Sequence, residues 1–140
     1  MQPQFDVVDT IASLSLFADL SRAQLEAVTH VFEEASFGQG ERILRQGLSG
    51  SNFFVILDGD VAIRIDGQDR ATLSRGDFFG ELSVLLSEPP VADVVALRPL
   101  RCLVLPGSEL ETFLVTYPRV AYRMVQALAR RLRAANRWRS

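Results

Sequence analysis

The fold is decided by residues 53–65, which read Phe53-Phe54-Val55-Ile56-Leu57-Asp58-Gly59-Asp60-Val61-Ala62-Ile63-Arg64-Ile65. The first five residues form a continuous apolar run. From Val61 onward, apolar side chains alternate with polar or small ones, which is typical of a half-buried strand. Asp58-Gly59 between the two runs indicates a hairpin, because glycine tolerates the positive φ of a type I′ turn. The segment therefore predicts two strands joined by that hairpin.

The flanking sequence extends this pattern into a mainly β domain with helices at both ends. Residues 91–97 and 101–105 predict further strands, and strands spaced every 8–12 residues or so favour a sandwich or jelly roll. Before them, the capping box Ser21-x-x-Gln24 opens a predicted helix over 22–30, which follows a helical turn over 8–14. After them, a second box at Ser108-x-x-Glu111 opens a helix to about Val115, and Pro118 begins a long helix. We expect a single domain with parts 1–31, 32–107 and 108–140.

Composition excludes several classes of protein. The chain has 140 residues, of which 48% are apolar and 23% charged, so it can bury a core and is neither disordered nor membrane-embedded. The single cysteine, Cys102, and single histidine, His30, exclude a disulfide framework and an ordinary zinc site, so we expect no metal. The first residues lack the pattern of a signal peptide, which favours a cytoplasmic protein.

The charge is unevenly distributed. All fifteen cations are arginines, and seven of them follow Pro118, whereas no acid follows Glu111. Residues 1–118 carry eight arginines against seventeen acids, a net charge of −9, and the remainder carries +7. The arginines either form a solvated helix face or dock on something acidic, such as nucleic acid, another domain or a partner subunit.

A short apolar segment, residues 78–86, interrupts the β pattern. A helix that opens at Gly80 lets a ligand approach exposed backbone N–H groups. Glu81 would repel a phosphate, but it could accept hydrogen bonds from a sugar hydroxyl. A structural glycine beside a solvated glutamate is the alternative interpretation of the same residues.

These residues resemble the cyclic nucleotide-binding domain family, found in catabolite activator proteins and cAMP-dependent kinase regulatory subunits. The resemblance runs through nearly the whole chain, and the residues that carry it are 16–21, 40–47, 53–59 and 76–82. Phe79-Gly80-Glu81-Leu82 is its most specific part. It implies an eight-stranded β-roll with an N-terminal helical element and two C-terminal helices. It also implies cAMP or cGMP as the ligand and dimerisation through the long helix.

The resemblance assigns ligand contacts position by position. Gly80 would approach the ribose and phosphate, and Glu81 would bind the ribose 2′-hydroxyl. Pro90 and Val91 occupy the positions of the phosphate-binding arginine and the residue after it, and neither supplies a side-chain donor. Arg75 or a C-terminal arginine is a possible substitute, while Asp93 adds negative charge nearby. The complete expected ligand-binding set is Gly80, Glu81, Leu82, Ser83, Pro90, Val91 and Asn136, the last facing the base.

Two hypotheses of function follow. The first is a regulatory sensor that binds a cyclic nucleotide or another small anion, with weakened or altered affinity. The second is a ligand-independent dimerisation or interaction scaffold. We expect no enzyme, because His30 and Cys102 sit in packing positions, and no direct DNA binding, because the chain stops at Ser140 without a helix-turn-helix. The long helix carries an apolar stripe that consists of Val120, Met124, Leu128, Leu132 and Ala135. The distal part of this stripe would be left exposed, which favours a homodimer.

Overall fold

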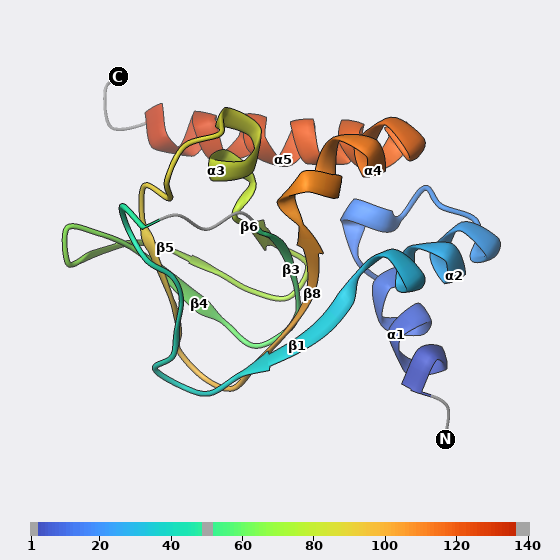
Figure 1. Cartoon of the computed structure of the whole chain (residues 1–140), viewed down its shortest axis with the longest axis horizontal. Helices are drawn as coiled ribbons and strands as arrows, with labels where there is room; N and C mark the ends of the chain where they lie inside the picture. Colours follow the sequence, from blue (N-terminus) through green and yellow to red (C-terminus); the bar gives the residue numbers. More distant parts are fainter. Residues whose placement is uncertain (1–2, 49–51, 137–140) are drawn as a thin grey trace.

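The computed structural model describes residues 3–48 and 52–136, and within these ranges eight strands form two antiparallel sheets flanked by helices (Figure 1). The helices are α1 (Pro3–Ala12), α2 (Arg22–Val31), α3 (Glu81–Leu86), α4 (Leu110–Thr116) and α5 (Pro118–Asn136), with 3-10 turns η1 (Ser15–Phe17) and η2 (Gly107–Glu109). The strands are β1 (Glu33–Phe37), β2 (Arg42–Leu44), β3 (Asn52–Asp58), β4 (Val61–Ile65), β5 (Gln68–Leu73), β6 (Phe78–Phe79), β7 (Asp93–Ala96) and β8 (Leu100–Pro106). The predicted β-roll with a long C-terminal helix is confirmed. None of the helices in the described ranges is long and apolar enough to cross a membrane.

Strand order explains why the run from Phe53 to Leu57 is apolar throughout. The two sheets have the orders β1-β8-β3-β6 and β2-β7-β4-β5. β3 lies inside the first sheet, where Phe53, Val55 and Leu57 join one core cluster. Phe54 and Ile56 join another on the opposite face. Both faces of β3 are therefore buried, so apolar and polar residues do not alternate along this strand.

The prediction of a hairpin at Asp58-Gly59 is wrong, because β3 and β4 belong to different sheets. The dipeptide instead passes the chain from one sheet to the other. Gly59 has φ +106°, and a Cβ there would lie 2.6 Å from the carbonyl oxygen of Pro99. The type I′ geometry occurs at Asp66-Gly67, where φ is 52° and 78° and Ile65 pairs with Gln68.

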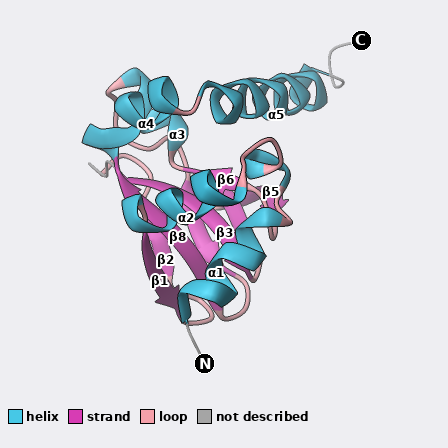
Figure 2. Cartoon of the chain, turned by 90° about the vertical axis from the view of Figure 1, so that its right-hand side faces the viewer, coloured by secondary structure: helices cyan, strands magenta, loops and turns pink. Residues whose placement is uncertain are grey.

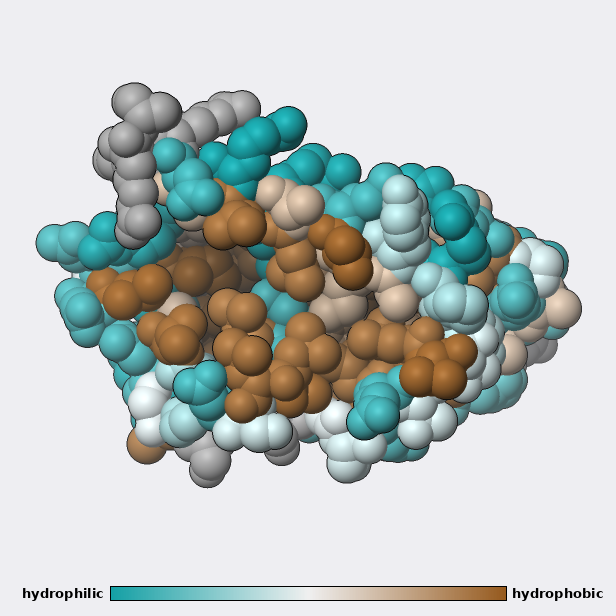
Figure 3. Space-filling model, turned by 90° about the horizontal axis from the view of Figure 1, so that it is seen from above, coloured by the Kyte–Doolittle hydropathy of each residue, from teal (hydrophilic) through white to brown (hydrophobic). Residues whose placement is uncertain are grey.

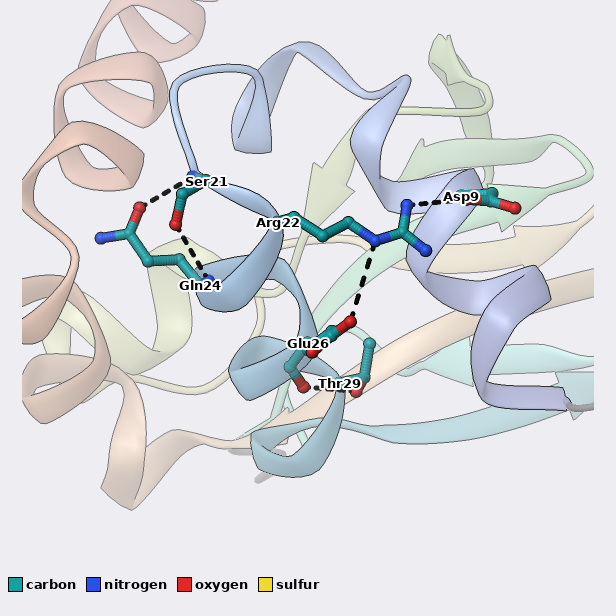
Figure 4. Close-up of polar contacts among 6 residues, drawn as sticks. All are labelled: Asp9, Ser21, Arg22, Gln24, Glu26 and Thr29. Atoms are coloured by element: carbon teal, nitrogen blue, oxygen red, sulfur yellow. Dashed lines mark hydrogen bonds and ion pairs between the residues drawn. The ribbon is translucent and has the colours of Figure 1, made fainter.

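One of the two predicted capping boxes is confirmed. The Gln24 N–H donates to Ser21 Oγ (3.2 Å), and the Ser21 N–H donates to Gln24 Oε1 (2.9 Å), as Figure 4 shows. The second prediction is wrong, because Ser108 lies inside η2 and α4 follows Glu109 without a side-chain cap. A residue already in a helical turn cannot take the extended conformation of an N-cap.

The helices pack against the sheet that contains β3 (Figure 2). Phe32, at the end of α2, contacts Phe17 and Phe113 edge to face, with ring centroids 6.3 and 5.1 Å apart. This cluster joins the N-terminal and C-terminal helices in one core. Cys102 is buried in the cluster between the sheets, and burial raises its pKa to about 12, which fits a packing role.

The long helix α5 divides into an anchored half and a projecting half. Val120 and Met124 are buried in the core, and Leu128 is half-buried. Leu132 is 63% exposed, as expected for the distal part of the predicted stripe. Arg123 holds the anchored half by donating two hydrogen bonds of 2.9 Å to the carboxylate of Asp19.

Candidate ligand-binding cavity

A cavity of about 520 Å³ opens beside the β2-β7-β4-β5 sheet. Its walls come from this sheet, from the junction of β6 and α3, from residues 90–94 and from the last turns of α5. The volume falls within the roughly 300–1,000 Å³ of small-molecule sites. Its apolar lining includes Leu44, Ile63, Leu73, Phe79, Val91 and Val94.

Six of the seven predicted ligand-binding residues line this one cavity: Gly80, Glu81, Leu82, Ser83, Pro90 and Val91. The sequence separates them into two groups, and the fold brings both groups to the lining of this cavity. Asn136 is exposed in the last turn of α5, where Ala134 and Ala135 line the cavity instead. The predicted contact of Asn136 with a base stays a prediction.

Gly80 is required by the close approach of α3 to β3. It has φ +88° and caps α3 in the left-handed conformation. A Cβ at this position would collide with the carbonyl oxygen of Asn52, and Phe54 Cδ1 would lie 3.3 Å away. This geometry sets Glu81 as the first residue of α3, with its side chain turned into the cavity wall.

Glu81 is a buried carboxylate held by a guanidinium from α5. The residue is 5% exposed, and burial raises its pKa, against the opposing effect of Arg131. Arg131 Nη1 lies 3.5 Å from Glu81 Oε2, and Nη2 donates to the Phe78 carbonyl oxygen at 2.7 Å. The guanidinium also stacks on the Phe78 ring, 4.3 Å from its centroid. Arg131 thus ties α5 to the segment that carries Glu81. Figure 1 shows the two elements concerned, α3 and α5, beside each other.

The part of the lining that comes from residues 90–94 carries no charged side chain. Pro90 is buried and has no N–H, and its carbonyl oxygen accepts a hydrogen bond from the Gly47 N–H at 2.9 Å. Ala92 and Val94 continue the wall. Asp93 was expected to add negative charge here, but it is not among the residues that line the cavity. Its Oδ1 accepts from the Gln46 N–H (2.7 Å), and the alternating residues of β7 face the cavity.

Residues 34–117 match the family model of the cyclic nucleotide-binding domain. The chain belongs to this family. It is 32% identical over 71% of its length to a cGMP-dependent protein kinase of Caenorhabditis briggsae, of which it spans 14%. The Thermus thermophilus catabolite activator protein is 31% identical, with a TM-score of 0.76, over 87% of this chain and 60% of that one.

A third comparison, at 24% identity, shows a likeness of fold alone. The regulatory subunit of a cAMP-independent protein kinase A from Trypanosoma cruzi, bound to guanosine, superposes with a TM-score of 0.73. The match covers 84% of this cyclic nucleotide-binding domain and 43% of that chain.

Two cavity-lining arginines, Arg70 and Arg131, were not identified individually from the sequence. Arg131 could have been found, because it follows Val120, Met124 and Leu128 at spacings of four and three, on the face that α5 packs inward, where an unpaired cation is costly. Arg70 could not, because it is the extra residue of a bulge between Ile63 and Arg64 in the β4–β5 ladder. Arg75, named as a possible substitute, donates to Ser13 Oγ (2.7 Å) and lies outside the cavity lining.

Proposed function

We propose that this domain is a non-enzymatic regulatory sensor with weakened affinity for cAMP and cGMP, and that its cavity signals occupancy to α5. The observation that carries the proposal is Pro90, a buried wall residue where the family resemblance expects an arginine. The open cavity favours ligand binding over a ligand-independent scaffold, which would be expected to fill this space with side chains.

The absence of this arginine should weaken the binding of a cyclic phosphate. A bidentate arginine–phosphate contact is stronger than neutral hydrogen bonds, and an anion buried without a cation loses its hydration uncompensated. Losing about 3–4 kcal/mol lowers affinity roughly 150- to 1,000-fold, which takes a micromolar site to the millimolar range. Val91 supplies no hydroxyl to offset this loss.

The Arg131–Glu81 pair supports coupling between the cavity and α5. A ligand hydroxyl that donates to Glu81 shares the carboxylate with Arg131, and the contact that holds the distal half of α5 changes with it. A ligand shifts an equilibrium only through such a differential interaction. Glu81 is the shared group in this mechanism.

Calorimetric titration with cAMP and cGMP tests the weakened binding. Wild-type protein should bind both in the millimolar range, and Pro90→Arg with Val91→Ser should improve affinity at least about 100-fold by restoring a charge-assisted pair. Val115→Ser, an exposed change on α4, is the control and should have no effect. Sub-micromolar binding by the wild type would contradict the assigned importance of Pro90.

A second candidate function, self-association through α5, is favoured by exposed apolar surface. Figure 3 shows apolar side chains gathered on the face seen from above. Large exposed hydrophobic side chains of α3 and α5 are Leu82, Leu85, Leu86, Tyr122, Val125 and Leu132. A second copy could cover such a patch symmetrically, with the α5 arginines placed near an acidic body.

Sedimentation equilibrium at low and high salt tests the dimer. We expect a dimer of moderate affinity that weakens as salt screens the charges. Leu132→Glu should abolish it, whereas Val115→Glu on α4 should not. A monomer at high micromolar concentration in both salts would refute self-association.

A further inference from the structure

We propose that a second cavity, formed where α5 packs against η1 and the turn between β5 and β6, binds the phosphate group of a small molecule. Its volume is about 290 Å³, close to the roughly 300 Å³ at the lower end of small-molecule sites. It shares three lining residues with the first cavity, namely Leu73, Arg131 and Ala134. The rest of its lining is its own, so the site is distinct from that of the proposed cyclic nucleotide sensor.

One face of α5 alternates arginine with alanine along this second cavity. Four lining residues follow one another at spacings of four, three and four: Arg123, Ala127, Arg130 and Ala134. These spacings place them on the same side of the helix. The alanines leave space beside the helix, and Arg123 and Arg130 lie two turns apart, about 10 Å along its axis. A ligand seated over Ala127 would therefore have a guanidinium toward each end.

The arginines of this face exceed their internal partners. Arg119 Nη2 lies 3.1 Å from Asp19 Oδ2, and Arg123 Nε donates to the same oxygen at 2.9 Å. Two guanidiniums on one carboxylate leave one positive charge uncompensated. The side chain of Arg130 makes no ion pair or hydrogen bond with any other residue in 3–48 or 52–136. Arg130 therefore adds a second cation without a partner.

Asp77 is the acid that lines this cavity, and its carboxylate is used within its own turn. Asp77 Oδ2 accepts a hydrogen bond from the Ser74 N–H at 2.9 Å. Arg131, also in the lining, is compensated by Glu81. In the lining and among its ion-pair partners, four arginines thus stand against three acids. The surplus positive charge favours an anion over a neutral or cationic ligand.

A phosphate group suits the donors that face this space. Its terminal oxygens can accept from several guanidiniums at once, and the planar fork of arginine matches them with paired hydrogen bonds. Arg123 uses Nε and Nη2 toward Asp19, so its Nη1 remains for a ligand. Ser15, exposed at the start of η1, lines the same cavity with a hydroxyl that can donate as well.

Titration calorimetry of the full chain with pyrophosphate and with acetate, at constant ionic strength, tests the proposal. Pyrophosphate should bind with a dissociation constant of about 1 mM or lower, and at least about tenfold more tightly than acetate. Arg130→Met should lower pyrophosphate affinity roughly 5- to 20-fold, because it removes a charge-assisted contact at an exposed position. Two matched controls should change nothing: Arg133→Met, an exposed arginine of α5 outside both linings, and Arg70→Met, which belongs to the first lining.

A second variant tests the η1 side of the same cavity. Ser15→Asp adds a negative charge to the lining and should weaken pyrophosphate binding at least about fivefold. Ser108→Asp adds the same charge at an exposed position of η2 and should have no effect. Ser15 and Arg130 are both exposed, and if one variant fails to fold, the other carries the test.

Three results would overturn the inference. The first is the absence of pyrophosphate binding at millimolar concentration, and the second is acetate binding of equal strength. The third is pyrophosphate binding that Arg130→Met or Ser15→Asp leaves unchanged, or that Arg133→Met or Arg70→Met weakens as much as Arg130→Met does. The titrations with cAMP and cGMP test the sensor separately, because the residues changed here, Arg70 apart, do not line the first cavity.

Discussion

The two faces of the β1-β8-β3-β6 sheet differ in how completely they are filled. On the helix-covered face, Phe17, Phe32 and Phe53 pack into a continuous core with α1, α2, α4 and α5. On the other face, a smaller cluster adjoins the open cavity, and a buried carboxylate–guanidinium pair lies at its edge. One face therefore supplies most of the core packing, while the other is less completely packed and borders the cavity. β3 serves both, through alternate side chains.

The largest expected effect is a truncation on the filled face. Phe53→Ala removes a side chain of 0% exposure and should lower the free energy of unfolding by about 3–5 kcal/mol. Phe79→Ala should cost less, because that ring, although it is 2% exposed, lines the open cavity rather than the continuous core. Urea denaturation measures both. Equal losses would contradict the contrast between the faces.

The next largest effect is expected at two glycines with positive φ. Gly67→Ala adds a Cβ that meets nothing within 4 Å. Only the left-handed backbone conformation should then lower the free energy of unfolding, by about 1–2 kcal/mol. Gly80→Ala incurs the same strain and also collides with the Asn52 carbonyl oxygen, so its loss should be larger by at least about 1 kcal/mol. Thermal unfolding of both variants checks this. A smaller loss for Gly80→Ala would show that α3 can move away from β3.

A smaller effect tests the charge pair at the edge of the cavity. Arg131→Met should cost about 2 kcal/mol, below the roughly 3–5 kcal/mol of fully buried pairs, because the Arg131 side chain is 32% exposed. Burial raises the pKa of Glu81 above its ordinary 4.5, so the contribution of this group to stability falls as pH rises through that range. Removing Arg131 raises this pKa further, and the deficit should therefore grow from acidic to neutral pH.

Two controls sharpen the charge-pair experiment. In a Glu81→Gln background, the loss of stability caused by Arg131→Met should not depend on pH, because no carboxyl titrates at position 81 in either of the two variants compared. Arg133→Met, an exposed change on the same helix, should leave stability unchanged. A pH-independent deficit in Arg131→Met would contradict the assigned role of the pair.

The smallest effect concerns an exposed pair on the filled face. Hydrogen bonds from Arg123 hold the pKa of Asp19 at about 2, below its ordinary 3.8. A lowered carboxyl pKa stabilises the fold above pH 3.8, and this stabilisation is lost as pH falls to about 2. The melting temperature of wild type should therefore exceed that of Asp19→Asn at neutral pH, and the two melting temperatures should converge in acid. The difference should also shrink in high salt. A constant difference across this pH range would rule out the pairing as its cause.

Local sequence was sufficient to predict an element where its own neighbouring residues supply the stabilising contacts. The capping box at Ser21 and Gln24 closes within three residues, so the start of α2 could be predicted. The alternation from Val61 onward predicted β4, because period-2 burial is a property of the strand itself. The grouping of Gly80 to Ser83 with Pro90 and Val91 came from the resemblance to a family, which carries long-range information that local pattern lacks.

Tertiary structure decided everything that depends on which distant segments meet. Asp58-Gly59 and Asp66-Gly67 are the same dipeptide, yet one crosses between sheets and the other closes a hairpin. The difference lies in the partners of the flanking strands, which the turn residues do not encode. Arg131 meets Glu81 because α5 is anchored through Val120 and Met124, and Arg70 enters the cavity through a bulge. The sequence by itself determined the start of α2 and the strand β4, and the family resemblance grouped Gly80 to Ser83 with Pro90 and Val91. Sheet register and helix packing determined which charged side chains line the cavity.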